Sequence, residues 1–187
     1  PEVLDELIKI CASKNIITIA DEVMTGFGRT GKFFASDYLK HKPDIICLSK
    51  GITGGVMPLG VTSCAQFIYD VFLSDDKMKT FFHGHSYTAN PTACSAALAS
   101  MDLFDKPETT QHIERIVSKH HQFLKHIQSH AGLLDARQLG TILAFEIQTR
   151  EHTHYLNSLA EYISTFFMER GIILRPLGNI VYVLPPY

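Results

Sequence analysis

Two short apolar runs, each ending in polar or glycine-containing sequence, most constrain the fold of this chain. Ile16-Ile17-Thr18-Ile19-Ala20 ends at Asp21, and Ile45-Ile46-Cys47-Leu48 ends at Ser49-Lys50-Gly51. The first run is nearly continuous in β-branched residues, which is typical of a strand that is covered on both faces in a parallel sheet. We therefore expect an α/β layer whose ligand binds in the loops beyond the carboxyl ends of these strands.

The patterns on either side of these runs complete the layer. Helical spacing of apolar residues predicts helices over 2–14, 66–73 and 90–104, and another apolar run predicts a strand over 59–65. The segment 25–31 contains three glycines and is expected to be a loop. Strands that alternate with loops and helices favour an α/β layer over an all-β sandwich.

Proline and charged residues interrupt two helical patterns at 105–108, which predicts a domain boundary there. Residues 1–104 form the first domain on this interpretation, and 105–187 form a small second domain. Within the second, we expect helices over 110–130 and 156–170 and strands over 141–147, 172–174 and 180–184. This part is expected to be α+β.

Composition excludes several classes of protein. The chain has 187 residues, of which 45% are hydrophobic, so it can bury a core and disorder is not expected. Lys+Arg number 17 and Asp+Glu 19, without a long block of either sign, so we expect neither a nucleic-acid partner nor a membrane surface. The chain opens at Pro1-Glu2 without a signal peptide, as though it began within a longer protein.

Cysteine and histidine spacing does not predict a metal site. The four cysteines lack a CxxC pair and are expected to be buried thiols in a reducing compartment; they are Cys11, Cys47, Cys64 and Cys94. His83 and His85 alternate as in some metal sites, but no further ligand lies near enough in the sequence to complete a first coordination shell. We therefore expect no metal.

Asp21 and Lys50 are the candidate chemical groups. Each stands after an apolar run, and an acid directly after a buried strand needs a cationic partner. Taken singly, Asp21 could cap the following loop and Lys50 could be a solvated loop lysine. Together they indicate a pyridoxal phosphate site, because a buried lysine can form a Schiff base and a nearby carboxylate can keep a ring nitrogen protonated.

Two blocks around these residues resemble a known signature. Asp-Glu-Val-Met-Thr-Gly-Phe-Gly-Arg-Thr-Gly at 21–31 and Leu48-Ser49-Lys50-Gly51 resemble the motif of class III pyridoxal phosphate-dependent aminotransferases. The resemblance implies that Lys50 carries the cofactor as an imine and that Asp21 pairs with its pyridinium nitrogen. It also implies fold type I, with a partial large domain containing a mixed, mostly parallel sheet and a small C-terminal α+β domain.

The block Phe-His-Gly-His-Ser-Tyr-Thr-Ala-Asn-Pro at 82–91 resembles the family segment that reaches across a dimer interface to the other subunit's cofactor phosphate. The resemblance implies that Ser86 and the backbone of His85 contact phosphate and that Gly84 lines the substrate pocket. A helix N-terminus capped by Ser86 or Asn90 is a compatible interpretation, since helix N-termini bind phosphate.

The same block, with Thr53-Gly54-Gly55, is most similar to the family's members in biotin biosynthesis. Those members transfer the amino group of S-adenosylmethionine to 8-amino-7-oxononanoate, which implies these two substrates here. Two other functions stay open. One is a class III ω-aminotransferase acting on ornithine, 4-aminobutyrate or a related amine, and the other is a non-catalytic α/β binding module.

The segment 174–187 resembles the family's second-domain motif, in which an arginine binds the substrate carboxylate. This implies that role for Arg175, whose planar guanidinium suits a carboxylate, although an arginine after a strand could also be a surface residue. Tyr182 is expected near the substrate, but its alternation with apolar neighbours equally describes the buried face of a strand.

The resemblance also carries expectations about the whole protein. It implies a cytoplasmic homodimer whose large domain begins before this sequence does. On this interpretation the 187 residues are a carboxyl-side fragment. Such a fragment is expected to be inactive alone, to bind pyridoxal phosphate weakly, and to self-associate through exposed strand edges.

Overall fold

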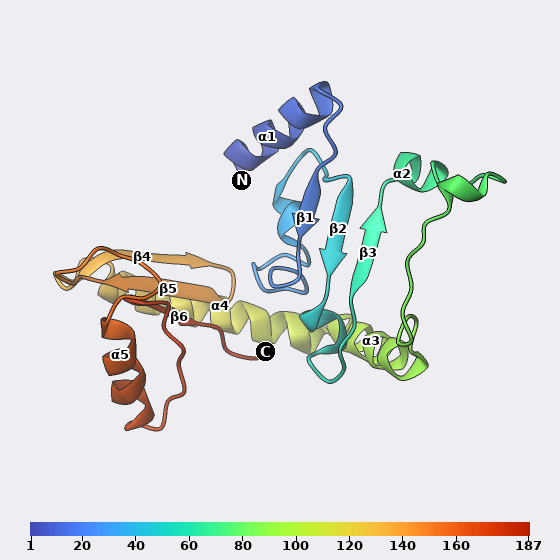
Figure 1. The fold of residues 1–187 in the computed structure, drawn as a ribbon. Coiled ribbons are helices and arrows are strands. Elements are labelled where there is room, and N and C mark those ends of the chain that lie inside the picture. The colour runs from blue at the N-terminus through green and yellow to red at the C-terminus, as the bar shows by residue number, and fades with distance from the viewer. The chain divides into compact units, whose positions relative to one another are not determined.

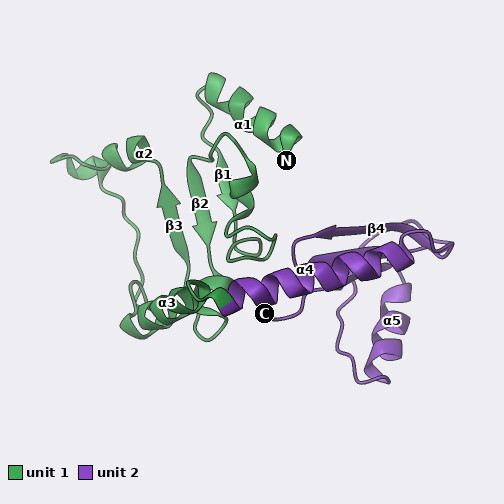
Figure 2. Cartoon of the chain, turned by 180° about the vertical axis from the view of Figure 1, so that it is seen from behind, with its two compact units in different colours: residues 1–107 green, residues 108–187 purple.

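The computed structural model describes residues 1–187, which divide into two compact units, Pro1–Pro107 and Glu108–Tyr187 (Figure 2). The first unit contains helices α1 (Glu2–Ser13), α2 (Gln66–Asp70) and α3 (Pro91–Phe104), 3-10 helices η1 (Ala35–Tyr38), η2 (Lys50–Thr53) and η3 (Lys77–Lys79), and strands β1 (Ile19–Asp21), β2 (Ile45–Leu48) and β3 (Val61–Cys64). Helix α4 (Pro107–Ile127) begins at the last residue of the first unit, and the second contains β4 (Leu133–Leu139), β5 (Ile142–Ile147), α5 (Leu159–Met168) and β6 (Ile180–Val183). None of these helices combines the length and apolar character that a membrane crossing requires.

The first unit is built on a three-stranded mixed sheet in the order β1-β2-β3. β1 and β2 are parallel, with Asp21 opposite Cys47, and β3 pairs antiparallel with β2. The carboxyl ends of β1 and β2 point toward α3 (Figure 1). The predicted α/β class is confirmed, and one pairing of this sheet is parallel and the other antiparallel.

β1 starts three residues later than the sequence pattern suggests. The chain leaves α1 through Asn15, whose φ is 56°, and the N–H of Ile16 donates to the carbonyl of Cys11 at 2.9 Å. Thr18 then donates its N–H and its hydroxyl to the Asp44 carboxylate, at 2.8 and 2.9 Å. These hydrogen bonds engage the backbone before residue 19, so the pairing with β2 begins only at Ile19.

The expectation that the first strand is covered on both faces is wrong for residues 1–187. Ile19 of β1 is 64% exposed, and all four residues of β3 are exposed. The prediction of buried thiols fails for the same reason, since Cys64 is exposed and the other three cysteines are half-buried. Side chains on a strand are buried only by elements that pack on its faces, and this chain supplies little such cover.

α3 forms where the sequence predicts it. Asn90 caps the helix, its Oδ1 accepting hydrogen bonds from the N–H groups of Thr92 and Ala93 at 2.9 and 3.3 Å, and Pro91 occupies the first turn. Near its other end, the hydroxyl of Ser100 donates to the carbonyl of Gly51 at 3.2 Å. The helix thereby contacts the turn that follows β2.

The second unit is an antiparallel sheet in the order β4-β5-β6 with two helices, which agrees with the predicted α+β class. Leu143, Ile163 and Val181 form its buried apolar core. The amide of Gln138 on β4 donates to the carbonyl of Val117 on α4 at 2.8 Å.

Two strand assignments in the second unit needed correction. β4 does not follow from the apolar pattern, and the strand expected over 172–174 does not form. Gly171, with φ of 73°, lies in the turn that follows α5, and the N–H of Ile172 donates back to the carbonyl of Phe167 at 3.0 Å. This helix-ending turn leaves Ile173 92% exposed and outside any sheet.

Candidate active site

Asp21 and Lys50 leave the sheet of the first unit at the same edge. Asp21 is the last residue of β1, and Lys50 is the second residue after the end of β2. Because these two strands are parallel and paired in register, their carboxyl ends coincide. In open α/β sheets, ligands bind beyond this edge.

Asp21 has one carboxylate oxygen engaged and one open. Its Oδ1 accepts a hydrogen bond from the N–H of Val23 at 3.0 Å. The side chain is exposed and forms no ion pair, so the expected cationic partner is not supplied by this chain. An exposed carboxylate is solvated by water and needs no such partner.

Lys50 sits in a tight turn of unusual backbone geometry. Its φ is 46°, in the left-handed region, and η2 is followed by Gly54, with φ of 61°. The hydroxyl of Ser49 donates to the carbonyl of Leu59 at 2.7 Å. The Lys50 side chain is exposed rather than buried, and its Nζ forms no hydrogen bond or ion pair. The turn therefore fixes the backbone and leaves the amine free.

Glu22, the residue after Asp21, is a buried carboxylate that sequence analysis missed. Only 2% of it is exposed. Its Oε2 accepts from the hydroxyl of Thr25 at 2.6 Å and the N–H of Ala35 at 2.9 Å, and its Oε1 accepts from the N–H of Ser36 at 2.7 Å. Burial alone would raise the pKa of Glu22, but these hydrogen bonds together outweigh it, and the pKa is lowered. The carboxylate is thus held in its ionised form.

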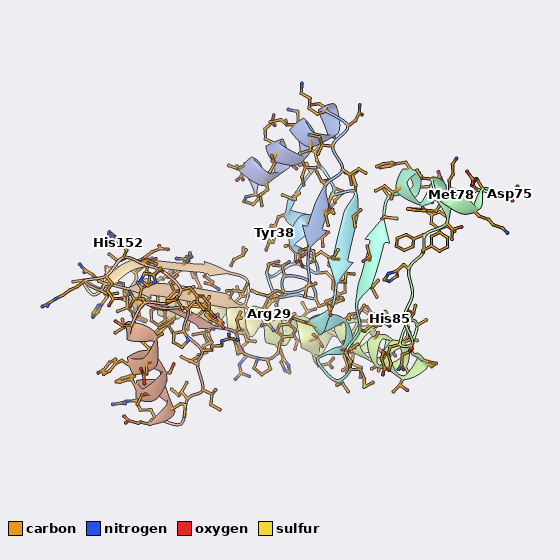
Figure 3. All side chains as sticks on the ribbon, viewed as in Figure 1. Arg29, Tyr38, Asp75, Met78, His85 and His152 are labelled. Carbon is orange, nitrogen blue, oxygen red and sulfur yellow. The ribbon has the colours of Figure 1, made fainter.

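A hollow of about 470 Å³ adjoins the Lys50 turn. Ser49 and the segment 58–60 form one side, and His83, His85 and the segment 87–89 form the other. Figure 3 shows His85 in the chain that leads into α3. The hollow lies beside the residue that precedes Lys50, and it has both polar and apolar walls.

The expected phosphate contacts lie in this segment. Gly84 and Ser86 are exposed and do not line the hollow. The N–H of His85 donates to the Thr88 hydroxyl at 2.9 Å, and the His85 Nδ1 accepts from the N–H of Tyr87 at 3.1 Å. A phosphate that bound the His85 backbone N–H would have to replace the Thr88 hydroxyl.

Arg175 and Tyr182 belong to the second unit, whereas Asp21, Lys50 and the 84–86 segment belong to the first. Arg175 is exposed, and its Nη2 donates to the Tyr155 hydroxyl at 3.4 Å. Tyr182 lies on β6 opposite Ala144 and is half-buried. Within this unit, the structure places the arginine shortly before the strand that carries the tyrosine.

The first unit's arrangement supports a specific chemistry. A free primary amine can form an imine with an aldehyde, and a carboxylate oxygen can hold the proton of a ring nitrogen. Lys50 and Asp21 supply these groups at one sheet edge, and small residues surround the lysine. The residues present therefore fit a pyridoxal phosphate cofactor.

Comparison with known proteins gives a consistent result. The family described as Aminotransferase class-III matches residues 1–187. The adenosylmethionine-8-amino-7-oxononanoate aminotransferase of Synechococcus elongatus is 41% identical over 187 residues, which are 100% of this chain and 43% of that protein. The chain thus spans less than half the length of this relative.

Solved structures are similar to this one. The crystal structure of the adenosylmethionine-8-amino-7-oxononanoate aminotransferase from Methanocaldococcus jannaschii matches with a TM-score of 0.88 and 36% identity, covering 98% of this chain and 44% of that one. An amine transaminase from an uncultivated Pseudomonas species, in the PLP-bound (internal aldimine) form, matches with a TM-score of 0.85 and 31% identity, covering 96% of this chain and 42% of that one.

Proposed function

This chain belongs to the class III aminotransferase family, and on that premise we propose that the protein is a pyridoxal phosphate-dependent transaminase of biotin biosynthesis. It transfers the amino group of S-adenosylmethionine to the ketone of 8-amino-7-oxononanoate, giving 7,8-diaminononanoate. One observation carries the proposal: Asp21 and Lys50 stand at the carboxyl edge of two parallel strands, in a chain that matches the family over its whole length. The substrates follow from the names of the relatives.

Lys50 and Asp21 are the proposed catalytic residues. Bound pyridoxal phosphate supplies a ring that accepts the electrons of the substrate's Cα–H bond. Lys50 would hold the cofactor through its Nζ and would move the proton at the substrate Cα as general base and acid. Asp21 would keep the ring nitrogen protonated; its Oδ1 accepts from the N–H of Val23, and its other oxygen accepts no hydrogen bond within the chain.

The remaining roles involve both domains. In a cytoplasmic homodimer, Ser86 and the His85 backbone bind the cofactor phosphate of the neighbouring subunit, and Gly84 lines the substrate pocket. Arg175 binds the substrate carboxylate with two parallel N–H groups, a geometry that lysine cannot supply. Tyr182 lies near the substrate.

The domain assignment follows from the same premise. Residues 1–104 are the carboxyl-side part of a large cofactor-binding domain, and residues 105–187 are the small domain. The compact units of the fold support this division, since the parallel strand pair and the arginine motif fall in different units.

Borohydride trapping tests the catalytic assignment. The full-length protein that carries this chain is supplied with pyridoxal phosphate, reduced, digested and mapped by mass spectrometry, with Lys50→Ala as the matched control. We expect a pyridoxyl adduct on the peptide that contains Lys50 and no adduct at that position in the control. An unlabelled Lys50 peptide would count against catalysis and in favour of a binding module.

A single-turnover half-reaction tests the substrate. The full-length protein that carries this chain, loaded with cofactor, is mixed with S-adenosylmethionine as sole amino donor, and conversion of the cofactor to its amine form is followed by absorbance. Ornithine and 4-aminobutyrate are the comparison donors. We expect turnover with S-adenosylmethionine, and turnover only with the ω-amines would replace this assignment by an ω-aminotransferase.

A further inference from the structure

The buried Glu22 carboxylate closes the loop that follows β1. Its side chain accepts hydrogen bonds from Thr25, Ala35 and Ser36. Ala35 and Ser36 lie 13 and 14 residues further along the chain than Glu22. The backbone carbonyl of Glu22 also accepts from the N–H of Gly26 at 2.9 Å. One side chain therefore gathers both ends of the 25–36 segment, which we call the Glu22 loop.

A buried aromatic ring of the Glu22 loop packs against the Lys50 turn. Phe27 is 2% exposed, so its ring packs inside the unit, and its φ is 60°. A Cβ added to Gly51 would lie 2.8 Å from Cβ and Cδ2 of this phenylalanine. The loop is thus packed directly against the residue that follows Lys50.

The Lys50 turn is also held by hydrogen bonds, one from α3 and one within the turn itself. The Gly51 carbonyl accepts from Ser100 on α3 at 3.2 Å, and the N–H of Ile52 donates to the Ser49 carbonyl at 3.2 Å. Lys50 itself keeps a left-handed backbone, which a lysine adopts only when its surroundings impose it. Phe27 and Ser100 are the contacts that hold the next residue, Gly51.

We propose that Glu22 is a positioning residue for Lys50, because it holds the Glu22 loop against Gly51 and so fixes the direction in which the Lys50 amine leaves the sheet. This inference rests on the proposed function, in which that amine carries the cofactor. Glu22 does not touch the cofactor. Its neighbour Asp21 accepts a separate hydrogen bond, from the N–H of Val23. A change at Glu22 therefore alters the position of the Glu22 loop before that of Asp21.

Glu22→Gln is the informative variant because it preserves shape and removes one acceptor. The carboxylate meets donors at both oxygens, so the amide NH₂ of glutamine must face a backbone N–H or the Thr25 hydroxyl. Asp37→Asn is the matched control. Asp37 is an exposed acid just beyond this loop. Its Oδ2 accepts from the N–H of Phe34, a residue of the loop, at 2.9 Å, and asparagine keeps an oxygen that can accept the same bond.

The measurement is the rate at which the full-length apoprotein that carries this chain forms the Lys50 imine with added pyridoxal phosphate, followed by absorbance and trapped with borohydride. We expect Glu22→Gln to form it about 10- to 100-fold more slowly, the loss that small misplacements of reacting groups produce. kcat should fall with it, while KM for S-adenosylmethionine changes by less than about twofold, since Glu22 contacts no substrate group. Asp37→Asn should match the wild type in every measurement.

Thr25→Val covers the case in which Glu22→Gln fails to fold. It removes one donor to the carboxylate and keeps the side-chain shape, so we expect imine formation to slow by about 2- to 10-fold, the effect of one ordinary hydrogen bond. A wild-type rate in correctly folded Glu22→Gln, or in Thr25→Val if the former does not fold, would overturn the positioning role. Absence of any Lys50 adduct in the wild type would instead overturn the proposed function, and this inference with it.

Discussion

Replacing Gly51 with alanine is expected to destabilise the fold by about 1–3 kcal/mol, the usual cost of overpacking a filled interior. A Cβ at this position would lie 2.8 Å from Cβ and Cδ2 of Phe27 and 3.0 Å from its Cγ. Favourable carbon–carbon contact begins at about 3.5 Å, so the ring or the turn would have to move by about 0.7 Å.

The ring has little room to make that movement. Phe27 is buried, and its ring centroid lies 5.5 Å from that of Phe33, 5.8 Å from that of Phe34 and 6.0 Å from that of Phe104. Any shift of Phe27 therefore disturbs three further aromatic contacts, each worth about 0.5–1.5 kcal/mol. This is why we expect a net loss although alanine restricts the unfolded chain more than glycine does.

Gly60→Ala is the matched control, because a Cβ there meets no atom within 4 Å and the φ of Gly60 is not positive. At such a site alanine should be neutral or stabilise by up to about 1 kcal/mol, through the lower entropy of the unfolded chain. Urea denaturation measures the free energy of unfolding of both variants, which is compared with that of the wild type at equal m-value. A Gly51→Ala variant as stable as the wild type, or a loss of equal size at both glycines, would refute the packing argument.

Three further predictions concern other sites. Asp21→Asn should lower kcat by about 100-fold and impair cofactor binding less, because asparagine keeps an oxygen for the Val23 N–H but cannot hold the ring proton by charge; kcat and cofactor titration compare the two. Burial lowers the pKa of His120 in the fold, so the unfolded chain binds its proton more readily and the free energy of unfolding should fall as the pH drops below about 6.5. Urea unfolding at several pH values gives the slope of the free energy of unfolding against pH. This slope should be smaller in His120→Gln and unchanged in the exposed control His121→Gln. Asn90→Ala should lose about 1 kcal/mol of stability and Asn90→Ser much less, because serine can still cap α3; thermal unfolding ranks them.

Several elements were predictable because their signals are local. Asn90 followed by Pro91 marks the start of α3 by side-chain capping and a fixed φ, and neither depends on distant contacts. The apolar run that became β2 was likewise predicted within its bounds. Motif residues Asp21 and Lys50 could be assigned to the same sheet edge because parallel strands share their carboxyl ends.

Other features depend on partners that the sequence pattern does not identify. β4 contains Asp135 and Arg137, and its charged residues hide the strand from a search for apolar runs. Ile172 and Ile173 look like a strand but follow the glycine in the turn after α5. Exposure was also mispredicted, since a β-branched run indicates a strand without indicating what covers it.

Glu22 could have been found from the sequence by one argument. Successive residues at the end of a strand point to opposite faces, so two adjacent acids cannot share an environment. The sequence does not reveal which of the two turns inward or which backbone groups meet it. In the structure Asp21 is exposed and Glu22 is buried among three donors.

The left-handed backbone at Lys50 lowers the stability of the fold, whereas the proposed chemistry requires a lysine at this position. An L-residue in this conformation costs about 1–2 kcal/mol that glycine avoids. With φ of 46°, position 50 is therefore one at which the fold would gain stability from Lys50→Gly, while the protein would lose its amine. Selection for thermal stability alone would remove this lysine, so any screen for more robust variants must hold position 50 fixed.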